Sequence, residues 1–78
     1  MENVNEEVEA LQQKADYFFK NKTAVHIKFK RGYFKRGMIT EISSDFFILQ
    51  EFLEGLQPCF FLQIEDIEPF KKRRRYEE

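Results

Sequence analysis

The chain has 78 residues, enough for one small domain. A single cysteine excludes an internal disulfide, and with only one histidine present a Cys/His zinc site within one subunit is excluded too. No apolar run approaches the roughly 20 residues that span a membrane, and the N-terminus is acidic. A hydrophobic content of 42% with ten Phe indicates a packed core. We therefore expect a folded, reduced, cytoplasmic protein with no membrane partner.

The net charge of −1 hides a sorting of charges into blocks. Residues 1–19 sum to −4, residues 20–36 to +7, residues 37–70 to −7 and residues 71–78 to +3. Such sorting allows one small domain to carry a basic face and an acidic face. The alternative is that the blocks interleave in the folded protein and cancel.

The first segment is predicted to form a helix over about residues 4–20. Its apolar residues recur at spacings of 4, 3, 4 and 3, which places them on one helical stripe: Val4, Val8, Leu11, Ala15 and Phe18. The stripe spans fewer than three heptads, so a helix that docks on a core is favoured over a coiled coil.

From Ala24 onward the apolar period changes to two, which is typical of strands. The first strand alternates buried Val25, Ile27 and Phe29 with outward polar residues, and a turn around Gly32 follows. A second strand carries an internal glycine, Gly37, which usually marks a sharp bend or a close backbone approach. The expected later strands cover residues 34–42, 46–52, 59–64 and 67–70, with connections at residues 54–58 and a break at residues 65–66.

One helix followed by five short antiparallel strands predicts a mostly β protein, a small closed five-stranded barrel with an N-terminal helix. An OB-fold also has five strands, but its helix usually lies between the third and fourth strands. We expect a single domain over residues 1–70, with the barrel at about residues 24–70, and a basic flexible tail at residues 71–78.

The order of these elements resembles the Sm-like family, which includes the LSm and Hfq-like proteins. The likeness runs over residues 25–69. It is carried by a first motif and by a closing motif: Val25-x-Ile27-x-Phe29, Gly32 and Gly37-x-Ile39-x-x-Ile42, then Ile64-x-x-Ile67-x-Pro69. The resemblance implies the Sm-like (SH3-like) barrel with a helix lying on it.

The chain departs from the family at the positions that bind uridine. Sm proteins use an Asp and an Asn there, and this chain has Ser43 and Phe47. The Lys-His pair that Hfq carries in its fourth strand is Phe61-Leu62 here. The resemblance thus carries over the fold and leaves the uridine pocket without a match.

Family members assemble as rings of six or seven subunits through their fourth and fifth strands, so the resemblance implies a homo-oligomer. The sequence offers its own reason, because the chain has no charge from Leu56 to Ile64 and an apolar edge strand invites association. The alternative is that the helix and the core cover this strand. The predicted interface residues are Phe60, Phe61, Leu62, Ile64 and Ile67.

The strongest candidate for a binding site is the basic run around the first turn, where an aromatic side chain lies among cations. Cations can hold phosphates while an aromatic ring stacks on a base. An ordinary solvated strand face is the plainer interpretation. The predicted RNA-binding residues are His26, Lys28, Lys30, Arg31, Tyr33 and Arg36, with Lys72, Arg73 and Arg74 of the tail.

No catalytic set can be assembled from one histidine and three glycines, so we expect no enzyme activity, no cofactor, no metal site and no small-molecule substrate. The sequence therefore predicts an Sm-like RNA-binding protein whose partners are RNA and further copies of itself. The alternative is a monomeric SH3-like barrel that acts as a protein–protein interaction module.

Overall fold

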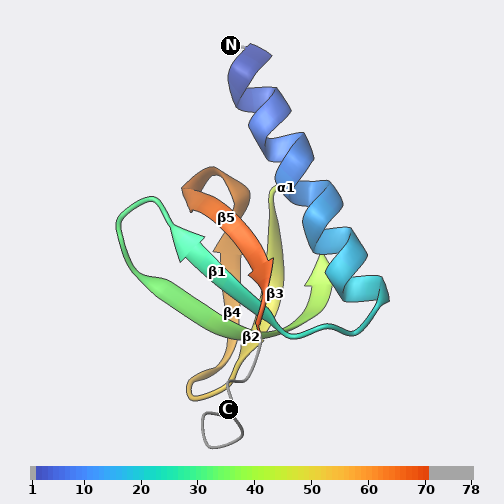
Figure 1. Ribbon diagram of the computed structural model, residues 1–78, viewed down its shortest axis with the longest axis vertical. Coiled ribbons are helices and arrows are strands. Elements are labelled where there is room, and N and C mark those ends of the chain that lie inside the picture. The colour runs from blue at the N-terminus through green and yellow to red at the C-terminus, as the bar shows by residue number, and fades with distance from the viewer. Residues whose placement is uncertain (1, 71–78) are drawn as a thin grey trace, which may run out of the picture.

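The computed structural model describes residues 2–70, with side chains from Glu6 onward, as one long helix and five strands (Figure 1). The elements in chain order are α1 (Glu2–Lys20), β1 (Val25–Phe29), β2 (Phe34–Ile42), β3 (Phe46–Glu51), β4 (Gly55–Phe60), a short 3-10 helix η1 (Phe61–Gln63) and β5 (Ile64–Pro69). The predicted order of one helix and then five strands is confirmed. The helix α1 is not long and apolar enough to cross a lipid bilayer.

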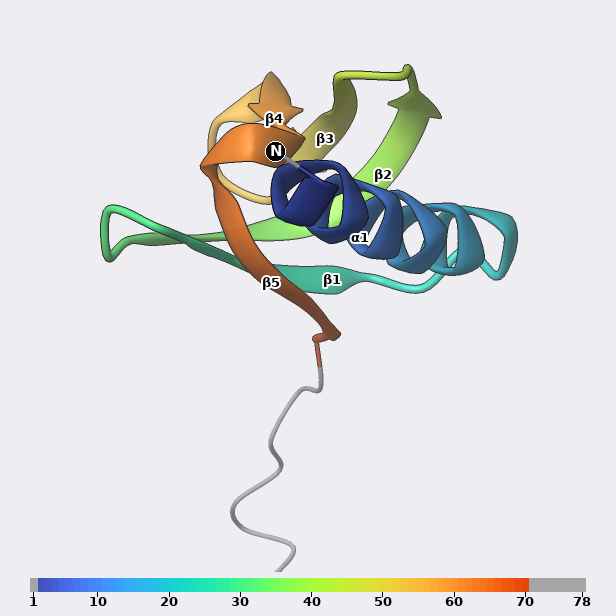
Figure 2. The ribbon, with the colours of Figure 1, turned by 90° about the horizontal axis from the view of Figure 1, so that it is seen from above.

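The five strands form one antiparallel sheet in the order β4-β3-β2-β1-β5. The sheet curls, and α1 lies along its concave side (Figure 2). Gly37 in β2 lies against the backbone of Gln50 in β3 so closely that a Cβ atom at this position would overlap the Gln50 carbonyl oxygen. This close approach accounts for the glycine that the sequence placed inside the strand.

The apolar stripe of α1 packs on the sheet. Leu11 and Ala15 are buried, and Val8 and Phe18 pack against the core at its margin. The helix ends in a Schellman-type cap, in which the N–H of Thr23 donates to the carbonyl oxygen of Phe18. The cap residue with positive φ is Lys22, at 52°, where glycine is usual.

The core lies between the sheet and α1. The alternation predicted for the first strand is confirmed, because Val25, Ile27 and Phe29 are all buried. The other buried side chains come from each remaining strand and from η1: Ile39, Phe47, Leu49, Cys59, Phe61, Ile64 and Ile67.

Two boundaries differ from those predicted. The fourth strand was predicted at residues 59–64, but β4 covers Gly55–Phe60. The break before the fifth strand was predicted at residues 65–66, but it falls in η1, so that β5 already begins at Ile64. Pro58 had suggested a connection, but it lies inside β4 opposite Ile48. A proline has no N–H to donate to a neighbouring strand. Because β4 is an edge strand of the sheet, it tolerates Pro58.

The predicted mostly β fold of five strands behind an N-terminal helix is confirmed, but the strand ladder of the single chain is not closed. Within residues 2–70, β4 and β5 are the two edges of the sheet and do not pair with each other. Each edge strand therefore presents one row of backbone groups without a strand partner.

Candidate nucleic-acid interface

The outer face of β1 and β2 brings together four of the polar and aromatic side chains of the basic run. In the antiparallel register His26 lies opposite Arg36, and Lys28 lies opposite Phe34. Opposite residues in a ladder share a face, so all four belong to the side of the sheet away from the core. The His26 ring meets the Phe34 ring edge-on with centroids 4.7 Å apart, and Phe34 stays 53% exposed.

The same face extends to two aromatic residues from distant parts of the chain. The Arg36 guanidinium lies over the Phe70 ring at 5.6 Å, and the Phe70 and Phe52 ring centroids are 5.8 Å apart. The backbone N–H of Phe52 donates to the carbonyl oxygen of Arg36 at 3.0 Å, which fixes Phe52 beside β2. We call His26, Lys28, Phe34, Arg36, Phe52 and Phe70 the outer-face cluster.

The turn between β1 and β2 carries the remaining predicted residues, but Tyr33 and Lys30 lie toward the core and α1 rather than with this cluster, because Tyr33 stacks on buried Phe29 and Lys30 pairs with Glu7 of α1. Gly32 has a φ of 98°, and its N–H donates to the Phe29 carbonyl oxygen at 2.9 Å. Tyr33 stacks on Phe29 with centroids 4.6 Å apart and planes 9° apart, so one ring face is covered and the side chain remains 43% exposed. Lys30 and Arg31 are exposed on the turn.

Ion pairs show that the charge blocks partly interleave. Lys28 lies 3.8 Å from Glu65 of β5, and Lys30 lies 3.9 Å from Glu7 of α1. Both pairs are half exposed, so their strength is modest and they compete weakly with an incoming phosphate. Among the ion pairs between side chains of residues 6–70, none involves Arg31 or Arg36.

Lys35 lies in the basic run but points to the other side of the sheet. It is opposite Ile27 in the ladder, and its Nζ donates to Gln57 Oε1 at 2.6 Å. The same ammonium lies 5.7 Å from the centroid of the Phe29 ring. Lys35 is therefore a half-buried polar contact at the margin of the core, and the outer-face cluster does not include it.

The predicted interface residues divide into two groups. Phe60 and Leu62 are exposed, at 42% and 61%, whereas Phe61, Ile64 and Ile67 are each 1% exposed and belong to the core. The curled sheet and α1 enclose the side chains of Phe61, Ile64 and Ile67 within the single chain, and the role of all five residues at an interface stays a prediction. These three can take part in an interface only through their backbone groups.

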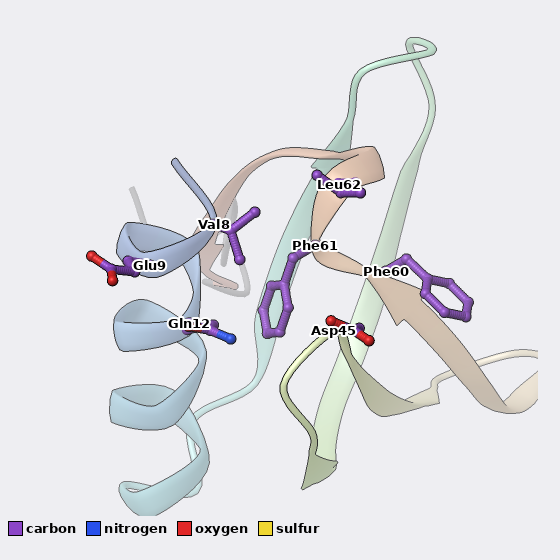
Figure 3. A pocket seen from close by; sticks show the side chains of 7 residues that line it. All are labelled: Val8, Glu9, Gln12, Asp45, Phe60, Phe61 and Leu62. Carbon is purple, nitrogen blue, oxygen red and sulfur yellow. The ribbon is translucent and has the colours of Figure 1, made fainter. Parts of the chain in front are cut away.

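A cavity of about 460 Å³ opens between α1 and the end of β4 (Figure 3). Its lining combines apolar side chains with an amide and two carboxylates: Val8, Glu9, Gln12, Asp45, Phe60, Phe61 and Leu62. In Figure 3, Val8 and Gln12 point from α1 toward Phe61, whereas the side chain of Glu9 points away from them. No Lys or Arg lines this cavity, which we call the Asp45 pocket.

Sequence reasoning found the cations of the outer-face cluster and missed its phenylalanines. Phe34 could have been found, since it follows the turn with the same alternation as His26 and Lys28. Phe52 and Phe70 could not, because only the fold brings them to Arg36. Lys72, Arg73 and Arg74 lie outside the described residues and stay predictions.

A curled five-stranded antiparallel sheet in the order β4-β3-β2-β1-β5, preceded by a helix, is the Sm-like fold. Comparison with solved structures supports this assignment. The chain is similar to the 1.55 Å crystal structure of the pleiotropic translational regulator Hfq, with a TM-score of 0.64 and 20% sequence identity over 70% of this chain and 90% of that one. At this identity the likeness establishes the fold. No protein-family model matches the chain, and no curated protein matches it.

Proposed function

We propose that this protein is a cytoplasmic, homo-oligomeric Sm-like ring that binds RNA through its outer-face cluster and the neighbouring turn. The observation that supports RNA binding is the register of β1 and β2, which sets Lys28 and Arg36 among exposed aromatic rings. Cations neutralise phosphates and aromatic faces stack on bases, a combination that serves single-stranded nucleic acid with little sequence preference.

The proposed ring follows from the two sheet edges. The strand β4 carries no charged side chain from Gly55 to Phe60, and exposed Leu56 and Phe60 flank Pro58 on it. An apolar, unpaired edge promotes association, and a cyclic contact from the β4 edge of one copy to the β5 edge of the next leaves no free edge. Assembly also repeats the outer-face cluster around the ring, so weak contacts of single subunits add up along one RNA strand.

Light scattering on a sizing column tests the ring. We expect a mass of about 57 kDa for six copies or about 66 kDa for seven, from a subunit of 9.5 kDa. A mass near 9.5 kDa would overturn the ring and favour the monomeric interaction module.

Fluorescence anisotropy with a single-stranded RNA, at 50 mM and 200 mM salt, tests RNA binding. We expect the affinity to fall steeply as the salt concentration rises. Arg36→Ala should weaken binding and reduce by about one the slope of log affinity against log salt concentration. Lys20→Ala removes the same charge from the exposed end of α1 and serves as the matched control. Equal losses in the two variants, or binding that ignores salt, would contradict the proposal.

A further inference from the structure

We propose that Asp66 controls the pairing of β5 with a second copy of the chain, because its carboxylate occupies the backbone N–H of Ile67, which this pairing uses. We call this arrangement the Asp66 gate. The proposal rests on the ring proposed above and concerns how the contact between two copies is controlled. It does not depend on the number of subunits in the ring or on RNA binding.

The strand register determines which backbone groups of β5 point to its free edge. The N–H of Phe70 donates to the carbonyl oxygen of Ala24 at 2.8 Å, so the backbone groups of Phe70 face the β1 side. Backbone groups alternate in direction along an antiparallel strand, so those of Ile67 and Pro69 face away from β1. Because proline has no N–H, Ile67 carries the only backbone donor that residues 66–69 turn to the free edge.

The Asp66 side chain already binds this donor in the single chain. The N–H of Ile67 donates to Asp66 Oδ1 at 2.9 Å, and Lys14 Nζ of α1 donates to the same oxygen at 2.6 Å. Figure 2 shows how close α1 lies to β5. The Asp66 side chain remains 38% exposed, so a strand of a second copy can reach the N–H beside it and replace the carboxylate.

The β4 edge of a second copy lacks a donor at its centre. The N–H of Phe61 donates to the carbonyl oxygen of Asp45, on the β3 side of the strand. By the same alternation, Leu56, Pro58 and Phe60 turn their backbone groups to the free edge. Pro58 offers a carbonyl oxygen and no N–H, so acceptors outnumber donors on this edge. The β5 edge must then supply a donor, which is the N–H that the gate occupies.

The gate weakens the contact between copies without preventing it. Pairing exchanges the hydrogen bond between Ile67 and Asp66 for one to β4 of the next copy, so no hydrogen bond is gained at this position. A strand edge with a free donor would also pair with other extended chains. An occupied donor favours a partner that buries apolar surface as well, and exposed Leu56 and Phe60 give β4 that surface.

Dilution of the assembly tests the gate. Mass photometry and light scattering measure the mass of each variant from nanomolar to micromolar concentrations. Asp66→Ala removes the acceptor and frees the N–H of Ile67. We therefore expect this variant to be half dissociated at a concentration at least about fivefold lower than the wild type.

Asp66→Asn is the matched control at the same position. It removes the charge and the ion pair with Lys14, but it keeps a side-chain oxygen that accepts a hydrogen bond from Ile67. We expect it to dissociate at about the concentration of the wild type. Circular dichroism of each variant confirms that it is folded.

Each outcome bears on one proposal or on both. An Asp66→Ala assembly that dissociates at the wild-type concentration or a higher one overturns the gate and leaves the ring standing. Equal tightening by Asp66→Ala and Asp66→Asn shows that the charge alone opposes assembly and also overturns the gate. A monomeric wild type with an Asp66→Ala variant that assembles supports the gate and overturns the ring of the wild type. Monomers in every case overturn both.

Discussion

Lys14 of α1 and Asp66 of β5 are joined by a hydrogen-bonded ion pair of 2.6 Å between Nζ and Oδ1. The pair links the helix directly to an edge strand of the sheet. The hydrogen bond from Lys14 holds the pKa of Asp66 below its usual value of 3.8, and a second bond from the Ile67 N–H acts in the same direction.

This relationship predicts a pH dependence of stability. A carboxyl group with a lowered pKa in the folded state stabilises the fold above its ordinary pKa, and the contribution is lost as the pH falls below 3.8. Both side chains are partly exposed, so we expect Asp66→Asn to cost no more than about 1 kcal/mol at pH 7. Urea unfolding at pH 7 and at pH 3 measures the effect, and an equal cost at both values would contradict it.

Substitution by alanine should destabilise the protein more at Gly37 than at Gly55. A Cβ atom at Gly37 overlaps the Gln50 carbonyl oxygen of the next strand, so β2 and β3 must move apart. We expect Gly37→Ala to lower the free energy of unfolding by about 3 kcal/mol or more. Gly55 has free space and a φ of 89°, so its substitution should cost only about 1 kcal/mol. Chemical denaturation that ranks them in reverse would refute the close approach.

Lys22 offers a substitution that should stabilise the protein. It occupies the cap position after α1 with a φ of 52°. This left-handed conformation has a higher free energy for a residue with a Cβ atom than for glycine. Its N–H donates to the Phe19 carbonyl oxygen through the backbone, so glycine keeps that bond. We expect Lys22→Gly to raise the free energy of unfolding by about 0.5–1 kcal/mol. Lys20→Gly lies within the helix and should destabilise by a similar amount, which gives the opposite sign as a control.

The alternation of apolar residues was enough to predict β1 and β2, because each turns one face to the core. It failed for β4, where Pro58 and Gly55 resemble a loop and only an edge position makes them compatible with a strand. Contacts between distant segments, such as Phe52 with Phe70, leave no local pattern at all. The cations of the candidate site and Phe34 were therefore predictable, whereas Phe52 and Phe70 were not.

The same limit applies to the Asp45 pocket. In the sequence, Asp45 stands in a short polar segment with Ser43 and Ser44, which is an ordinary composition for a turn. Only the packing of α1 against η1 brings Gln12 and Leu62 to the same cavity. A cavity lined by three separated segments has no spacing that a sequence motif could express.

Cys59 is expected to resist thiol reagents in the folded protein. Its side chain is 1% exposed, and burial raises the pKa of the thiol from 9.0 to about 11. Because the thiolate is the reactive form, both effects slow labelling at pH 8, and we expect it to be at least about a hundredfold slower than in denaturant. Ellman's reagent measures both rates. Rapid labelling of the native protein would show that β4 opens readily at the sheet edge.

Phe60 and Phe61 are neighbours in sequence with opposite surroundings, and they predict opposite phenotypes. Phe61 is buried against Phe47 at a centroid distance of 5.5 Å, so Phe61→Ala should lower the free energy of unfolding by about 3–5 kcal/mol. Phe60 is 42% exposed and its ring lies 5.2 Å from the half-buried ring of Phe46, so Phe60→Ala should cost about 1 kcal/mol or less.

The proposed ring allows a second test of Phe60, in which the mass of the assembly is measured. If β4 forms the contact between copies, Phe60→Asp places a charge on an apolar interface and should reduce the mass in light scattering to that of one subunit, while circular dichroism still reports a folded chain. The matched control is Phe52→Asp, at another exposed phenylalanine just beyond the end of β3, which should keep the mass of the ring. Dissociation by both variants would point to a general effect of charge, and dissociation by neither would place the contact away from β4.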